Sequence, residues 1–436
     1  TMIAAAHAVR QLEVAIALSP TDVLNHRDTV PELAEIEGYT CSGSFAGRNI
    51  DNFYLTALKG KVPCSLSGAV HACFGDGAAS SGVKHVLVTS GFFVLHELGA
   101  APVSGIHAGS CETDGPLGAM ALLRAFAMRG VHVSLFSEPH NGPVMRQAHA
   151  AMLQWMDRLD PAMSERLRRF VRLVECDGRP YQGAPLREQM LAQCADLNAA
   201  VGRAWPADQH PGPIDCLFAL ERLGAPYKNI RGLDISAHTE PIDCIWPFSS
   251  PPPGTAAQLA MSAWMQTHGL VVGDVETMRA AAGVVPDALT LGVGDGGNEV
   301  GMGRIVHLDD AMGALKPSGN TEYVATSVNG CYRSCDHVLL ATVSNWAGSA
   351  FELASRALLG APANGPDHVA LIERAGASLA DLEKHVLQAI CAPPARSVDG
   401  VFPEREMSID GMPFEPKHRD LYTMLWRTAK SSPNGW

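Results

Sequence analysis

Five short apolar segments alternate along this chain with longer segments of helical pattern. The apolar segments are rich in β-branched and aliphatic residues, and glycine or polar residues follow each of them: residues 84–89, 131–136, 214–219, 288–293 and 337–342. This pattern is typical of buried strands. Residues 116–129 begin with proline, are rich in alanine and leucine and stop before Gly130, as a helix between two strands does. Because strands joined by helices run parallel, we expect an α/β fold: a mostly parallel sheet with helices on both faces, in a Rossmann-like three-layer arrangement.

The remaining segments predict additions to this core. We expect residues 1–50 to form an N-terminal helical extension and residues 51–436 to form the α/β domain. Residues 145–205 are charged, helical in pattern and poor in glycine, so they predict a helical insertion. Residues 249–254 (Ser-Ser-Pro-Pro-Pro-Gly) are typical of a stiff connector, and a helix is expected at about residues 256–267.

Polar or glycine-bearing turns follow the predicted strands. In open parallel sheets, ligands bind beyond the carboxyl ends of the strands, which all lie at one edge. The sequence therefore predicts one pocket, formed by five turns: residues 89–93, 137–141, 221–224, 294–299 and 344–346.

The segment 291–303, Leu-Gly-Val-Gly-Asp-Gly-Gly-Asn-Glu-Val-Gly-Met-Gly, is the strongest candidate for a site, because six of its thirteen residues are glycine. Glycine allows tight turns and close approach of a ligand to the backbone. Asp295 and Glu299 are four residues apart, so they could flank a cation or share a proton, or they could simply be solvated turn residues. The spacing Gly292-x-Gly-x-x-Gly297 formally matches a dinucleotide fingerprint. However, no clear helix follows it, and Asp295 would repel a pyrophosphate.

Two other segments carry candidate site residues. Glu112 and Asp114 lie just before the helix at residues 116–129. Asp114 could act in catalysis or cap the helix, and the helix start could bind a carboxylate ligand. Arg222 follows a strand and is suited to hold a carboxylate with two parallel hydrogen bonds, although a surface salt bridge with Glu221 or a neighbour is the alternative.

Composition limits the partners. The chain has 436 residues, 47% of them hydrophobic, and a formal net charge of −12. This charge gives no reason to expect nucleic acid or a membrane surface as a partner, and no apolar run approaches the length of a transmembrane helix. The 11 cysteines are scattered without a disulfide framework, so we expect reduced thiols and an intracellular protein. The oligomeric state is left open.

Several motifs occur in an order that resembles the D-glutamate cyclase family, specifically its C-terminal catalytic-type domain. The resemblance covers roughly residues 50–420 and rests on Thr89-Ser-Gly-Phe-Phe93, Glu112-Thr-Asp-Gly-Pro-Leu-Gly-Ala119, Glu221-Arg-Leu-Gly224, the glycine-rich segment up to Gly303, Val343-Ser-Asn-Trp346 and Met407-Ser-Ile-Asp-Gly-Met-Pro-Phe414. It implies a hydro-lyase that converts D-glutamate into 5-oxo-D-proline and water, in the mitochondrial matrix or the cytoplasm.

The resemblance and the strand-end rule together predict the site. We expect four catalytic carboxylates: Glu112, Asp114, Asp295 and Glu299. The residues expected to bind substrate are Gly91, Phe92, Gly115, Arg222, Gly294, Gly296, Gly297, Asn298 and Asn345. No organic cofactor is expected, and a divalent metal ion on Asp295 and Glu299 is an alternative to proton transfer by carboxyl groups.

Two other functions remain open from the sequence. One is a binding protein for an amino acid or another small acid, which would need the same pocket polarity. The other is a nucleotide-dependent enzyme on a Rossmann-like sheet.

Overall fold

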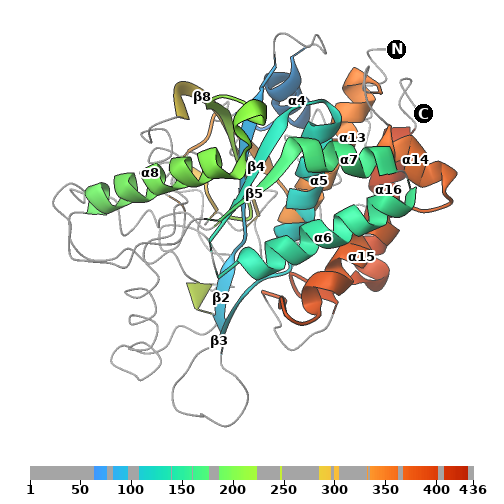
Figure 1. Ribbon diagram of the computed structural model, residues 1–436. Coiled ribbons are helices and arrows are strands. Elements are labelled where there is room, and N and C mark those ends of the chain that lie inside the picture. The colour runs from blue at the N-terminus through green and yellow to red at the C-terminus, as the bar shows by residue number, and fades with distance from the viewer. Residues whose placement is uncertain are drawn as a thin grey trace, which may run out of the picture.

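A parallel sheet of six strands runs through the centre of the computed structural model (Figure 1). The structure describes residues 63–75, 82–96, 108–138, 140–159, 161–175, 186–222, 246–247, 284–295, 299–303, 331, 334–361, 367–400 and 407–430. The strands are β1 (His85–Ser90), β4 (His132–Ser137), β5 (Val171–Glu175), β6 (Ile214–Leu220), β8 (Val284–Gly294) and β9 (His337–Leu340). Their order is β5-β4-β1-β6-β8-β9, with every neighbour parallel. The chain therefore builds outwards from β1 first on one side and then on the other, as in a doubly wound sheet.

Helices cover both faces of this sheet. One face carries α4 (Leu66–Phe74), α5 (Pro116–Met128), α6 (Gly142–Leu159), α7 (Pro161–Phe170), α13 (Ser344–Leu359), α14 (His368–Arg374), α15 (Leu379–Cys391) and α16 (Arg419–Lys430), and α8 (Leu186–Ala204) covers the other. Successive residues of β1 point to opposite faces: Val86 and Val88 pack with the first group, and Leu87 packs beside Trp205 just after α8. Burial on both faces explains why the strands are apolar throughout, and it confirms the predicted three-layer α/β fold.

The five predicted strands are all present, and the structure adds β5. The predicted helical segment, residues 145–205, does contain α6, α7 and α8, but β5 lies between α7 and α8 and pairs with β4 along its length. The expectation of a purely helical segment is therefore wrong at β5. This strand is only five residues long and carries Arg172 and Glu175, so its polar residues hid it. Residues 1–50, 249–254 and 256–267 lie outside the described residues.

Smaller elements complete the described structure. A second sheet has the order β3-β2-β7, with β2 (Phe93–His96), β3 (Ala108–Cys111) and β7 (Trp246–Pro247). Near the C-terminal end, β10 (Ser408–Ile409) and β11 (Met412–Pro413) form a hairpin, followed by a π-helical turn, η4 (Phe414–His418). A 3-10 turn, η3 (Ala207–Gln209), precedes β6. None of the helices in the described part of the chain is long and apolar enough to cross a membrane.

Helices α5 and α13 pack unusually closely, and glycine makes this possible. A Cβ atom built on Gly348 of α13 would lie 2.6 Å from the Cα atom of Gly118 in α5, closer than real atoms approach. The two backbones therefore touch directly. This contact brings the N-terminal ends of both helices together at the carboxyl edge of the sheet.

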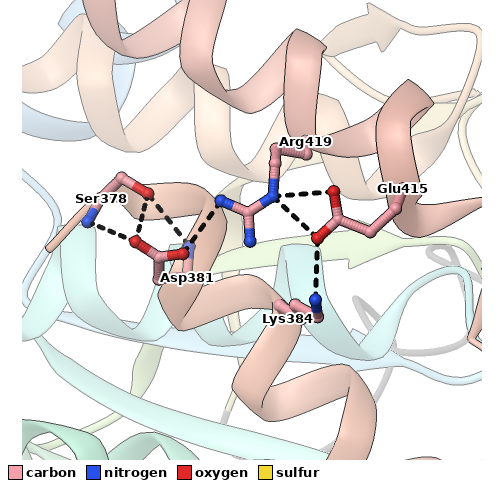
Figure 2. Close-up of polar contacts among 5 residues, drawn as sticks. All are labelled: Ser378, Asp381, Lys384, Glu415 and Arg419. Carbon is pink, nitrogen blue, oxygen red and sulfur yellow. Dashed lines mark hydrogen bonds and ion pairs between the residues drawn. The ribbon is translucent and has the colours of Figure 1, made fainter.

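A surface network joins α15 to α16 (Figure 2). Ser378 caps α15, where its Oγ accepts from Asp381 N at 3.2 Å and Asp381 Oδ2 accepts from Ser378 N at 3.0 Å. Arg419 Nη1 donates to Asp381 Oδ1 at 3.0 Å, and Arg419 Nε donates to Glu415 Oε1 at 2.8 Å. Lys384 Nζ also donates to Glu415 Oε1, at 2.8 Å. Exposed ion pairs stabilise little individually, but this set orients α16 on α15.

A buried ion cluster joins α5, α13 and α15 inside the helical layer. Arg124 donates from Nε and Nη2 to the two carboxylate oxygens of Glu352, each at 2.8 Å, and from Nη2 to Glu383 Oε1 at 2.7 Å. All three side chains are essentially inaccessible to solvent. Burial raises the pKa of Glu383 to about 7, with Arg124 opposing the rise and Glu352 adding to it.

The raised pKa of Glu383 predicts a pH-dependent stability. Between about pH 4.5 and 7 the folded protein binds a proton at Glu383 that the unfolded chain releases, so the free energy of unfolding falls as pH rises through this window. In Glu383→Gln this contribution is absent. Denaturant titrations from about pH 5 to pH 8 should show the wild-type free energy falling by about 2 kcal/mol relative to the variant.

Glu415→Gln is the matched control. Hydrogen bonds from Lys384 and Arg419 lower the pKa of this exposed carboxyl, so it stays ionised throughout the same window. The difference between wild type and Glu415→Gln should therefore not change with pH. An equal slope for Glu383→Gln and wild type would contradict the prediction.

Candidate functional site

The carboxyl edge of the sheet gathers buried polar side chains from five strands, as the strand-end turns predict. Each is at most 4% exposed: Ser90 at the end of β1, Glu138 and Asn141 after β4, Glu221 and Arg222 after β6, Asp295 after β8, and Ser344 and Asn345 after β9. Buried polar groups are costly unless they are paired, so a concentration of them is poor core material. The edge lies at the switch point between β1 and β6, where doubly wound sheets bind their ligands.

The second sheet positions Glu112 at this edge. Strand β2 pairs antiparallel with β3, and Glu112 N donates to Phe92 O at 2.9 Å, which continues the pairing by one residue. The Glu112 carboxylate lies directly against Gly400, where any Cβ atom would overlap it. Phe92 is buried and packs with Val94, so the described role of this predicted substrate-binding residue is to hold the strand that carries Glu112.

Asp114 and Asn345 cap each other's helices. Asp114 accepts hydrogen bonds from Ser344 N at 2.9 Å and Asn345 N at 2.8 Å, which are the first backbone groups of α13. In return, Asn345 Oδ1 accepts from Gly115 N at 2.9 Å and Gly118 N at 2.8 Å at the start of α5. Asp114 is therefore a helix cap, as one alternative from the sequence expected. However, it caps α13, whereas the sequence suggested α5, the helix that follows it. The sequence predicted that the start of α5 could bind a carboxylate ligand, but backbone N–H groups there already donate to Asn345 Oδ1.

Two triads of buried carboxylates share Asp295. One triad is Asp114, Asp295 and Asp410, and the other is Glu221, Asp295 and Glu299; within each, carboxylate oxygens lie within 4.8 Å of one another. Like charges at this distance in a buried site favour protonation of some members or capture of a cation. Oxygen ligands of this kind suit hard divalent cations such as Mg²⁺, Mn²⁺ or Ca²⁺.

Asp410 enters the cluster from the β10–β11 hairpin, and the sequence analysis gave it no role. Asp410 and Gly411 form the two-residue turn, with φ of +53° and +76°, as Asp-Gly turns between paired strands require. Both carboxylate oxygens of Asp399 accept from Gly411 N, at 2.9 and 2.8 Å. The signal that could have identified Asp410 is the Asp-Gly pair between apolar residues in a motif already quoted for the resemblance.

A buried histidine fixes this hairpin to α13. Trp346 Nε1 donates to His418 Nδ1 at 3.0 Å, and His418 Nε2 lies 3.2 Å from Ile409 O. An indole can only donate, so Nδ1 is the acceptor and the proton sits on Nε2. Burial lowers the pKa of His418 to about 4, which keeps the ring neutral in this arrangement.

Glu221 is a strongly perturbed carboxyl of the site, and the sequence analysis considered it only as a salt-bridge partner. Its backbone has φ of +42°, which is rare and strained for glutamate and is typical of functional positions. Its Oε2 has no hydrogen-bond partner among the described residues. Burial, with Glu299, Asp114 and Glu112 adding to it, raises the pKa of Glu221 well above its usual range. Burial and the neighbouring carboxylates therefore favour the protonated form of Glu221.

Two predicted glycines make room for carboxylates. A Cβ atom on Gly115, which has φ of +98°, would lie 3.0 Å from both Glu221 Cβ and Ser90 Oγ. A Cβ atom on Gly294 would lie 2.7 Å from Glu299 Oε2. The predicted substrate-binding residues Gly296, Gly297 and Asn298 lie outside the described residues.

Arg222 forms a buried ion pair with Glu138, whereas the alternative from the sequence was a surface salt bridge with Glu221 or a neighbour. Arg222 Nη1 donates to Glu138 Oε2 at 2.6 Å, and Nη2 contacts Oε1. Asn141 Nδ2 is close to both Gly91 O, at 3.3 Å, and Glu138 Oε2, at 3.4 Å. Gly91, with φ of +110°, has no room for a side chain beside Asn141. Glu138 and Asn141 were not predicted individually, although both lie in or beside a turn assigned to the pocket.

Comparisons with known proteins point to one family. A sequence model of the family described as "D-glutamate cyclase-like, C-terminal" matches residues 56–250 and 265–425, which include every carboxylate of the two triads. The human protein "D-glutamate cyclase, mitochondrial" is 22% identical to this chain over 362 residues. The match covers 79% of this chain and 46% of the human protein, so the chain spans about half the length of that relative.

Asp114 and Glu221 should respond oppositely to loss of their carboxylates. In Asp114→Asn, an amide N–H replaces one acceptor oxygen and faces a backbone donor, so we expect the free energy of unfolding to fall by about 1–3 kcal/mol. In Glu221→Gln, an amide replaces a carboxyl whose neutral form is favoured by burial and by the neighbouring carboxylates, so the free energy of unfolding should be unchanged or higher. Denaturant titrations of both variants at pH 7 measure this contrast, and equal destabilisation would refute it.

Proposed function

Because this chain belongs to the D-glutamate cyclase-like family, we propose that it is a hydro-lyase that converts D-glutamate into 5-oxo-D-proline and water. The observation that supports this activity best is the buried carboxylate cluster centred on Asp295 at the switch point of the sheet. The name of the human relative supports a mitochondrial rather than a cytoplasmic location for the reaction.

The reaction needs proton transfers and a correctly oriented substrate. The α-ammonium must lose a proton so that its nitrogen can attack the γ-carboxyl carbon. The C–N bond then forms, a C–O bond breaks, and the oxygen leaves as water. Overall, two protons move from nitrogen to oxygen, so the protein only has to relay them. Holding the substrate curled is a large part of the catalysis, because orienting two reacting groups removes several kcal/mol from the barrier.

The described residues include candidates for the proton donor and for the proton acceptor of this reaction. Glu221, a buried carboxyl with a raised pKa, is suited to give a proton to the departing oxygen. Asp295 or Glu299 is suited to take the ammonium proton, and Glu112 is a further candidate. Asp114 accepts three backbone hydrogen bonds, so we assign it to positioning rather than to proton transfer.

A divalent cation is the alternative to proton transfer within the cluster. Glu221, Asp295 and Glu299 would hold it, and when bound it would polarise the γ-carboxylate. The carboxylates compensate their mutual repulsion in either way, by sharing protons or by binding an ion. Sensitivity of turnover to a chelator distinguishes the two.

The acidity of the edge argues against the nucleotide-dependent alternative. In doubly wound sheets the pyrophosphate lies at the turn after the first strand, at a helix start. Here β2 follows β1, the formal fingerprint follows β8, and the starts of α5 and α13 are capped by side chains. Buried carboxylates close to these helix starts would repel a pyrophosphate.

An NMR time course tests the proposed activity. Purified protein should produce 5-oxo-D-proline from D-glutamate, and a parallel sample with L-glutamate measures the stereochemical preference. EDTA should abolish the reaction, and Mg²⁺ or Mn²⁺ restore it, if a cation takes part; insensitivity to EDTA supports proton relay. Saturable binding of D-glutamate without product would favour the binding protein instead.

Substitutions within the cluster test the assignments. We expect Asp295→Asn and Glu221→Gln to lower kcat by at least about 100-fold, because each removes a group that acts in proton transfer or ion binding. Glu175→Gln, which removes an exposed ion pair with Arg146 at the end of β5, should leave kcat unchanged. Full activity in Asp295→Asn would exclude the cluster as the catalytic centre.

A further inference from the structure

The Glu138–Arg222 ion pair lies at the same edge as the carboxylate cluster but belongs to neither triad. Both side chains are buried, and the pair links the ends of β4 and β6 across the intervening end of β1. The guanidinium carbon lies 5.8 Å from the centre of the Phe136 ring, so an aromatic side chain borders the pair. Buried ion pairs are often no more stabilising than apolar residues of similar size, so stability alone does not account for one here.

A second observation points to a ligand beside this pair. Asn141 is 1% exposed, and its Oδ1 has no hydrogen-bond partner among the described residues. The orientation of the amide is set by its neighbours, because both groups nearest to Nδ2, Gly91 O and Glu138 Oε2, are acceptors. A buried amide oxygen in this position calls for a donor that the described residues do not supply.

We infer that Glu138, Asn141 and Arg222 form a subsite for the zwitterionic head group of an α-amino acid. Arg222 receives the α-carboxylate with its forked N–H groups, and Glu138 together with Asn141 Oδ1 receives the α-ammonium. This inference rests on the proposed function for the identity of the amino acid, and it deepens that function by assigning the ammonium partner.

The charges explain why a zwitterion fits and a simple anion does not. In the structure, Glu138 and Arg222 neutralise each other. An anion that bound Arg222 would separate them and leave the Glu138 carboxylate buried without a counter-charge. A head group with both charges replaces the pair completely, since each partner exchanges one opposite charge for another. The subsite therefore selects ligands that carry an ammonium next to the carboxylate.

A matched pair of ligands that cannot form a lactam tests this. D-homocysteate and 4-sulfobutanoate both carry a carboxylate and a sulfonate, and only the first carries an α-ammonium. Calorimetric titration of wild-type protein should give D-homocysteate a Kd at least ~30-fold lower, because the second ligand leaves Glu138 uncompensated. In Glu138→Gln the preference should fall below about 5-fold, and Glu175→Gln should keep it.

The outcomes separate this inference from the proposed activity. Equal Kd values in wild type, no binding of D-homocysteate, or an undiminished preference in folded Glu138→Gln would each overturn the subsite. If Glu138→Gln does not fold, the wild-type ratio of Kd values alone decides. A strong preference without formation of 5-oxo-D-proline would support the subsite and refute the cyclase. Formation of 5-oxo-D-proline with equal Kd values for the two ligands would support the cyclase and refute the subsite.

Discussion

The backbone contact between α5 and α13 is the constraint on which the site depends. Gly118 and Gly348 let the two helices touch, and only at this distance can Asp114 and Asn345 each reach the first turn of the other helix. The caps satisfy backbone N–H groups that would otherwise be buried without partners. They also fix Asp114 beside Asp295, so one contact between two glycines sets both the helical layer and one corner of the carboxylate cluster.

The carboxylate cluster is electrostatically unfavourable, because it places like charges close together in a buried site. In the helical layer, by contrast, a buried cation accompanies the buried carboxyl groups, because Arg124 contacts both Glu352 and Glu383. Around Asp295, carboxylates lie next to other carboxylates. The positive φ angles of Glu221 and Asp410 hold two of them in place. Such an arrangement opposes stability and persists where function requires it. The large apolar core, of which α5 is a part, gives the fold the stability to tolerate it.

Much of this could be predicted from the sequence, and the limits have physical causes. Apolar strands buried on both faces are visible as continuous hydrophobic runs, so five of the six strands and the edge that carries the site followed from the pattern. Strand β5 was missed because its Arg172 and Glu175 interrupt the run. Roles that depend on contacts between distant segments were not predictable. Asp114 resembles a cap of its own helix until α13 is placed beside it, and Arg222 can be assigned to Glu138 only when β4 and β6 flank β1.

The origin of Asp410 has a consequence for how the protein matures. All six strands of the main sheet precede residue 341, whereas Asp410 is presented by a hairpin that His418 fastens to Trp346. During synthesis, the sheet and α13 can therefore assemble on the ribosome before the last carboxylate of the cluster has been added. A nascent chain at that stage has the fold but not the complete set of charges. Completion of the site is in this way coupled to synthesis of the C-terminal helices.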